Sequence, residues 1–306
     1  MSVTIADGIW PTMITPFTET SDIDYVALER LIEWYIEGGV DGLFAVCQSS
    51  EMFYLTLEER TQLARFVRES AAGRVPVIAS GHVSDAAGDQ LAELQAIAST
   101  GVDAVVLVTN RLARPDETDE TWKRNAERIM QALPDVTLGL YECPSPYKRL
   151  LPPELLRWCA DTGRFAFLKD TSCDPRQIAT KLKAVRGTPL RLFNANAATL
   201  LESLKDGAAG YSGIMANFHP DLYAALFRFV RAGEWMEAER LQSYLGLASV
   251  IERQLYPANA KYHARLEGLP LRVKGRSSAA AMTISMEYEV AQLRAAAETF
   301  RATFRQ

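Results

Sequence analysis

The sequence predicts a (β/α)8 TIM barrel of the α/β class with a C-terminal helical appendage. Two observations predict it. Short apolar runs of strand length alternate with longer stretches of helical period as far as Pro220, and strict βα alternation requires parallel strands. There are eight such runs, the number that closes a barrel with helices outside, and no strand-like run follows them. We therefore expect a barrel over residues 1–220 and a helical region over residues 221–306.

The expected elements are bounded by Gly, Asp or Pro turns. The strands are Ile9–Ile14, Gly42–Val46, Pro76–Ala79, Ala104–Val108, Thr137–Tyr141, Phe165–Lys169, Leu190–Phe193 and Ala209–Gly213. The helices between them are Tyr25–Gly38, Leu57–Ala72, Asp85–Thr100, Asp119–Ala132, Pro153–Thr162, Asp174–Val185 and Ala198–Lys205. The C-terminal helices are Leu222–Ala232, Glu234–Val250 and Ser277–Phe304. Thr56 followed by Glu59 is typical of a capped helix start, and Pro153 suits a first helical turn.

Composition excludes several classes of protein. The 306 residues are 48% hydrophobic and 23% charged, as in soluble globular proteins. The formal charge of −5 leaves no basic surplus for a nucleic-acid backbone, so nucleic acid is not an expected partner. The start MSVTIADGIW lacks a signal-peptide pattern, and no apolar run approaches about 18 residues, so we expect a cytoplasmic protein without a membrane partner. The four cysteines and three histidines show no metal-ligand spacing, so we expect no metal site.

The residues that end the strands are the candidates for chemistry, because a βα barrel builds its active site at the C-terminal ends of its strands. Lys169 ends an apolar run from which a lysine is normally excluded. Burial there would lower its pKa and supply a neutral amine that attacks a carbonyl carbon. The alternative is a lysine that extends to solvent or pairs with Asp170.

Tyr141 ends the preceding strand and is expected beside Lys169, because adjacent strands lie about 4.8 Å apart. A phenol next to a neutral amine can transfer protons during imine chemistry. The turn at Ser49 and Ser50 adds hydroxyl and N–H donors for a small carboxylate at the same mouth, although ordinary loop chemistry also explains these serines.

Strand alternation turns Glu142 away from the direction of Tyr141. His82, without a ligand partner, is more typical of a structural histidine.

The chain resembles the family of dihydrodipicolinate synthase and N-acetylneuraminate lyase, Schiff-base enzymes built on this barrel. Phe167-Leu168-Lys169-Asp170-Thr171 matches the family's lysine strand, and Tyr141 has the expected place on the strand before it. The segment from Asp41 through Glu51 to Arg60 is similar to the family's G-[ST]-[ST]-G-E segment and the helix after it. Gly207–Gly210, followed by Asn217, resembles the eighth-strand region.

The resemblance implies a lyase or aldolase that forms a Schiff base between Lys169 and pyruvate or another 2-keto acid. Tyr141 would relay protons, and Ser49 would hold the carboxylate of the keto acid. The imine accepts the electron pair of the breaking bond, so no metal or organic cofactor is expected. The resemblance also implies a homotetramer or homodimer. The remaining residues that we assign to substrate binding are Gln48, Ser50, Thr171, Asn194, Ala195, Ile214 and Arg111.

Three departures from the family pattern bear on the substrate. Gln48 replaces the hydroxyl residue that usually bonds the shuttle tyrosine, and Leu112 replaces the tyrosine that reaches into a neighbouring subunit. The synthases' N-x-P-x-R after the tyrosine reads Glu142-Cys143-Pro144-Ser145-Pro146 here, without the arginine that grips the second substrate's carboxylate. Asn194-Ala195-Asn196 replaces the adjacent carboxylates of the sialic-acid lyases.

Three functions stay open on the sequence. The first is a lyase that makes or breaks a carbon–carbon bond. The second is a dehydratase or deaminase of the same family, including a 4-hydroxy-tetrahydrodipicolinate synthase-like activity. The third is a catalytically weak barrel that binds keto acids. Turnover would separate the third from the first two, and product analysis would separate those two from each other.

Overall fold

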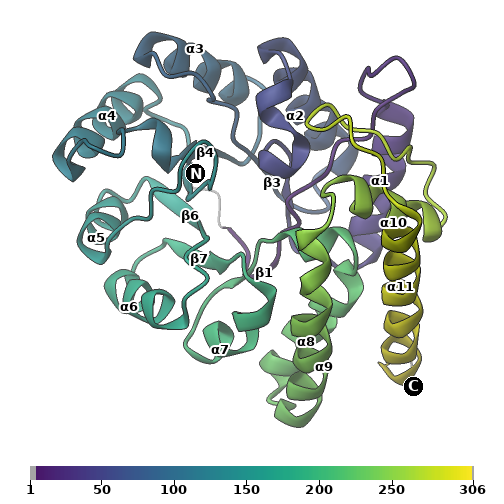
Figure 1. Cartoon of the computed structure of the whole chain (residues 1–306). Helices are drawn as coiled ribbons and strands as arrows, with labels where there is room; N and C mark the ends of the chain where they lie inside the picture. Colours follow the sequence, from purple (N-terminus) through teal and green to yellow (C-terminus); the bar gives the residue numbers. More distant parts are fainter. Residues whose placement is uncertain (1–4, 305–306) are drawn as a thin grey trace.

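The computed structural model describes residues 5–304, which form eight parallel strands curled into a barrel with helices around it (Figure 1). The strands are β1 (Gly8–Ile9), β2 (Leu43–Phe44), β3 (Val77–Ala79), β4 (Ala104–Val108), β5 (Leu138–Tyr141), β6 (Phe165–Asp170), β7 (Arg191–Asn194) and β8 (Gly210–Tyr211). They pair in the order β1-β8-β7-β6-β5-β4-β3-β2. A parallel bridge between Thr12 and Phe44 joins the segment after β1 to β2 and closes the sheet. The predicted (β/α)8 fold is confirmed.

Each strand is followed by a helix on the outside of the sheet. These helices are α1 (Tyr25–Glu37), α2 (Leu57–Ala71), α3 (Ala87–Ala98), α4 (Asp119–Ala132), α5 (Pro153–Asp161), α6 (Pro175–Val185), α7 (Leu200–Lys205) and α8 (Pro220–Ala232). The predicted cap of α2 is present, because the N–H of Glu59 donates to the Thr56 hydroxyl and the N–H of Thr56 donates to the Glu59 carboxylate. Helix α8 packs on β1 and α1, where the barrel closes.

The first strand is shorter than predicted. Only Gly8–Ile9 pairs as a strand with β8, whereas a strand was expected over Ile9–Ile14. The chain changes partner around Pro11, which has no N–H to donate. Before it, Trp10 N–H donates to the carbonyl of Tyr211, and after it, Met13 N–H donates to the carbonyl of Phe44.

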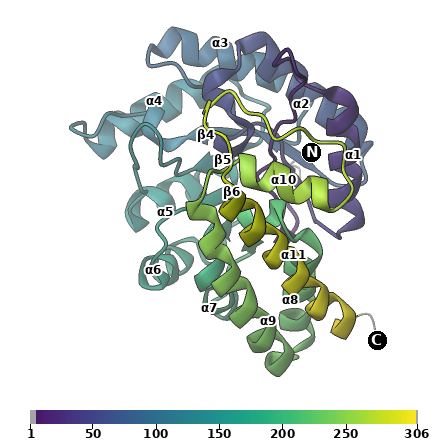
Figure 2. The same cartoon turned by 45° about the vertical axis from the view of Figure 1, so that its right-hand side comes forward.

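The C-terminal region contains three further helices: α9 (Trp235–Ala248), α10 (Ala258–Leu266) and α11 (Ile284–Phe304). Figure 2 shows α11 crossing this side of the molecule, where it packs on α10 and α8. Helix α10 was not predicted. Helix α11 begins at Ile284 rather than Ser277, and the N–H groups of Arg276 and Ser277 donate to the carboxylate of Glu51. The division into two domains at residue 220 stays a prediction.

Aromatic side chains fill the barrel below the strand ends. The rings of Phe167 and Phe193 stack with centroids 4.7 Å apart, and Phe44 meets Phe167 edge-on at 5.9 Å. Trp10 packs against this group, and only glycine fits at Gly42, because a Cβ there would lie 2.4 Å from the Trp10 ring. The packed core gives the strand ends above it a rigid base.

Over residues 5–304, no helix is both long and apolar enough to cross a membrane. In the same range, no group of three or more His, Cys, Asp or Glu side chains is arranged to hold a metal ion.

Candidate active site

Tyr141 and Lys169 are direct neighbours at the C-terminal ends of β5 and β6, as predicted. The two residues are register partners, and the Lys169 Nζ atom lies 4.6 Å from the centroid of the Tyr141 ring. Both side chains are almost fully buried, with residue exposures of 4% and 2%. The ring of Phe44 supports Tyr141 from below, edge-on at 5.6 Å. The barrel therefore holds a lysine amine and a phenol together in a largely dry site.

Burial sets the protonation of both groups. It lowers the pKa of Lys169, an effect that the side chains of Cys47, Cys143 and Glu252 oppose. It raises the pKa of Tyr141 well above its ordinary value, so the phenol stays protonated near neutral pH. A lysine with a lowered pKa has a larger neutral fraction, and the neutral amine is the nucleophile in Schiff-base formation.

A cavity of about 420 Å³ opens above these two side chains. Seven of the predicted site residues line it: Lys169, Tyr141, Gln48, Ser49, Thr171, Ala195 and Ile214. They come from the ends of β2, β5, β6, β7 and β8, so five strands contribute to one cavity. A volume of this size suits a small-molecule substrate.

Ser49 presents a hydroxyl to this cavity. Its Oγ donates to the Oγ1 of Thr12 at 3.2 Å and also interacts with the phenol of Tyr256. Thr171 is fixed nearby, because its hydroxyl donates to the backbone carbonyl of Glu142 at 2.6 Å. Each hydroxyl has a single proton, so it donates to a substrate carboxylate only by turning away from its present acceptor.

Three residues that the sequence assigned to substrate binding lie outside this cavity. The Ser50 hydroxyl donates to the carbonyls of Met13 and Ala45 in the barrel wall. The Asn194 amide donates to the hydroxyls of Thr199 and Ser203, behind β7.

Arg111 is the third of these residues. It pairs with Asp85 at 2.5 Å and lines a separate cavity of about 880 Å³ together with Leu112 and Arg114. The structure therefore does not bring these three side chains into the cavity lining: Ser50 and Asn194 bond other protein groups, and Arg111 lies behind the cavity residue Phe53, 5.6 Å from its ring centroid.

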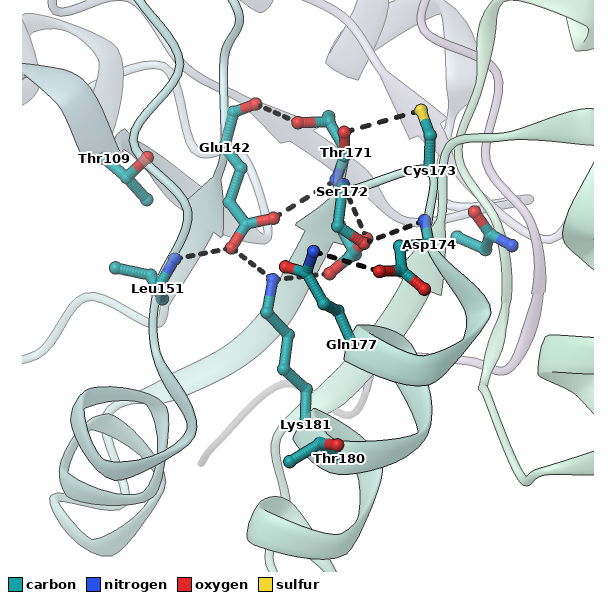
Figure 3. A network of polar contacts seen from close by, with 12 residues as sticks. Thr109, Glu142, Leu151, Thr171, Ser172, Cys173, Asp174, Gln177, Thr180 and Lys181 are labelled. Atoms are coloured by element: carbon teal, nitrogen blue, oxygen red, sulfur yellow. Dashed lines mark hydrogen bonds and ion pairs between the residues drawn. The ribbon is translucent and has the colours of Figure 1, made fainter.

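Figure 3 shows a network of polar contacts around Lys181 and Glu142, which includes residues next in the chain to those of the site. The Lys181 Nζ atom of α6 lies 2.6 Å from Glu142 Oε1 and 2.6 Å from Asp170 Oδ2. Glu142 follows Tyr141 and Asp170 follows Lys169, so a single ammonium group ties together the ends of β5 and β6. Burial raises the pKa of Glu142 to about 7, against the attraction of Lys181. As strand alternation predicts, Glu142 points away from the cavity.

The altered relay position contains a thiol as well as an amide. The Cys143 side chain lies against Tyr141, and its Sγ donates to Gln48 Oε1 at 3.5 Å. Cys143 thus stands between the phenol and the amide that replaces the family's hydroxyl.

The sequence missed several residues of the cavity. Glu252 and Tyr256 come from the C-terminal region, Lys148 from the loop after β5, and Asn196 from the loop after β7. Glu252 lies in a 3₁₀ helix, η6 (Ser249–Arg253), and burial raises its pKa to about 7. Asn196 was predictable as the residue two positions after the β7 end. Glu252 and Tyr256 follow no strand, so the rule that strand ends form the site could not identify them.

Comparison with a family model agrees with this geometry. The model of the Dihydrodipicolinate synthetase family matches residues 6–297, nearly the whole chain. The match includes the barrel, Tyr141, Lys169 and the C-terminal residues of the cavity.

Individual relatives carry the same family name. The chain is 26% identical over 273 residues to a 4-hydroxy-tetrahydrodipicolinate synthase of Gluconacetobacter diazotrophicus, covering 88% of this chain and 90% of that one. It is 28% identical over 256 residues to a synthase of the same name from Clostridium perfringens, covering 83% and 86%. In fold, it is similar to a prophage protein of the dihydrodipicolinic acid synthase family from E. coli K12, solved in complex with pyruvate. That match has a TM-score of 0.86 and 23% identity, and it covers 96% of this chain and 98% of that one.

Proposed function

Because the chain belongs to the dihydrodipicolinate synthetase family, we propose that it forms a Schiff base between Lys169 and pyruvate or another 2-keto acid and then makes or breaks a carbon–carbon bond. The family consists of lyases and synthases, so the chain is an enzyme of lyase or aldolase type. The observation that carries the proposal is the buried contact between Lys169 and Tyr141 at the floor of the cavity.

The mechanism begins with attack of the neutral Lys169 amine on the ketone carbon. Tyr141 donates a proton to the departing oxygen, and water leaves as the imine forms. Ser49 and the neighbouring backbone hold the carboxylate of the keto acid. The protonated imine then accepts the electron pair that is released when the bond between the third and fourth substrate carbons breaks.

One specific observation bears on 4-hydroxy-tetrahydrodipicolinate synthase activity, the name that the sequence relatives carry. That activity requires a grip on the carboxylate of a second substrate, for which the family uses an arginine. Of the described residues that line this cavity, none is an arginine, and Pro146 stands at the position of the family's arginine. We therefore rank this activity below carbon–carbon cleavage or synthesis as the proposed function. Dehydration and deamination keep the same lower rank.

The test is borohydride reduction in the presence of pyruvate, read by intact mass and peptide mapping. We expect one pyruvyl adduct on the Lys169 peptide and none in Lys169→Ala. Lys148→Ala is the matched control, because Lys148 is the other lysine of the cavity among the described residues and should leave the adduct unchanged. If neither pyruvate nor a panel of 2-keto acids gives an adduct on Lys169, the proposal fails and a keto-acid-binding barrel becomes the better account.

Several finer properties stay predictions that the family resemblance supports. They are independence from metals and cofactors, assembly into a homotetramer or homodimer, and a cytoplasmic location.

A further inference from the structure

Glu252 stands out among the cavity residues because its carboxylate has no partner. Its Oε1 atom is buried without a hydrogen bond, and no ion pair to Glu252 is found in residues 5–304. A buried acceptor without a partner costs roughly 1–3 kcal/mol, so proteins usually satisfy such groups or keep them for a ligand. The side chain lines the same cavity as Lys169.

The other charged side chains that line the cavity already have partners. Glu51 accepts from Lys261 at 2.8 Å and from the N–H groups of Arg276 and Ser277. Lys148 donates to the carbonyl of Thr171 at 2.8 Å. Lys169 is the amine that reacts, and Lys148 keeps its positive charge and two further N–H donors, so Glu252 is the carboxylate left to accept a hydrogen bond from the distal part of a substrate.

The chemistry of the cavity also limits what that distal part can be. No arginine lines the cavity among the described residues, so a second carboxylate would lack the bidentate partner that proteins commonly use for it. The carboxylate of Glu252 would repel it as well. An uncharged hydroxyl, by contrast, can donate its proton to a carboxylate oxygen.

We infer that Glu252 binds the hydroxyl on the fourth carbon of the keto acid and exchanges a proton with it, which makes the second product or substrate an uncharged aldehyde. This inference rests on the proposed Schiff-base function.

The proton and electron pairs balance in the cleavage direction. The hydroxyl proton passes to Glu252, and the oxygen electron pair forms the aldehyde C=O bond. The bond between the third and fourth carbons breaks, its electron pair forms the enamine C=C bond, and the imine nitrogen takes up the former C=N pair. Synthesis runs the same steps in reverse.

The protonation states of Tyr141 and Glu252 support Glu252 as the base. The phenol of Tyr141 has a pKa raised well above its ordinary value and is a poor base near neutral pH, whereas the pKa of Glu252 is raised to about 7 by burial, against the attraction of Lys169. The other titratable groups that respond to the charge of Glu252 are the phenols of Tyr211, Tyr223 and Tyr256, which burial keeps protonated.

The experiment compares wild type, Glu252→Gln and Glu287→Gln, a control that removes a carboxylate from α11 in the same C-terminal region. Each protein is tested for borohydride trapping of pyruvate and for condensation of pyruvate with glyceraldehyde or with succinate semialdehyde. All three should trap pyruvate. Wild type should prefer glyceraldehyde, and Glu252→Gln should lose about 100-fold or more in kcat/KM for it, together with the limb of the pH profile near 7. Glu287→Gln should behave as wild type.

Three results would overturn the inference while leaving the Schiff base intact: trapping with a preference for succinate semialdehyde, trapping with condensation of neither aldehyde, or Glu252→Gln within about threefold of wild type on glyceraldehyde. Absence of trapping in wild type would instead refute the proposed function. The aldehyde preference of wild type needs no variant, so it decides the matter even if Glu252→Gln folds poorly.

Discussion

Replacing Lys181 by methionine should destabilise the protein strongly. The Nζ atom is buried and lies 2.6 Å from both Glu142 and Asp170, so the substitution leaves two buried carboxylates without their cation. Removing one partner from such a buried network costs about 3–5 kcal/mol. For 306 residues at about 2.1 cal/mol/K each, the unfolding entropy is about 0.64 kcal/mol/K, so Tm should fall by about 5–8 °C.

Calorimetry at pH 7 and urea unfolding would measure both quantities. Lys183→Met is the matched control, because Lys183 lies on the same helix with an exposed side chain and its loss should change stability by no more than about 0.5 kcal/mol. Equal stability losses in the two variants would show that the network contributes no more than a surface charge, and the reasoning would be refuted.

Two further substitutions test other buried charges. Burial lowers the pKa of His219 to about 3, so the unfolded chain binds more protons below about pH 6.5 and stability falls as the pH drops from there. His219→Phe should reduce the pH slope of the unfolding free energy between pH 6 and 4 by about 1.4 kcal/mol per pH unit; an unchanged slope in urea titrations would contradict this. Lys261→Met removes the partner of Glu51, which also holds the N–H of Ser277, so it should cost about 3–5 kcal/mol and speed tryptic cleavage after Arg276. Cleavage at the wild-type rate would show that Glu51 holds this segment without its lysine.

The contact between Tyr141 and Lys169 was predictable from the sequence, because it follows from the geometry of parallel strands. Parallel strands end at one edge of the barrel, so Tyr141 and Lys169, each at a strand end, had to meet. The same period of two that turns Glu142 outward also turns Asn194 outward, because Phe193 before it packs in the core. Applying the alternation to β7 would have removed Asn194 from the site.

The error at Ser50 has a different cause. Ser49 and Ser50 lie in a 3₁₀ turn, η1 (Gln48–Ser50), where successive side chains point about 120° apart. Ser49 therefore faces the cavity while Ser50 bonds the barrel wall. A prediction that treats the two serines as one loop cannot tell which of their side chains faces the cavity.

Glu252 could not be predicted, because helical period reports the buried face of a segment and not which distant surface it covers. Its segment η6 packs on the short helix after β8, η5 (Ile214–Asn217), and so reaches the cavity from outside the strand pattern. Only the tertiary fold brings this carboxylate to the lysine, some eighty positions earlier in the chain.

In the proposed reaction the Lys169 amine changes charge, so the charged groups around this lysine bear on each step. Behind it, the Lys181 ammonium contacts both Asp170 and Glu142 and offsets one of their two negative charges. In front of it, burial favours the neutral forms of both Lys169 and Glu252, so the resting site can exist without net charge. When the imine forms and becomes positive, ionised Glu252 can balance it within the same cavity. A carboxylate that balances the iminium and accepts the hydroxyl proton would join both steps, which explains why its hydrogen-bonding capacity is left unused in the free protein.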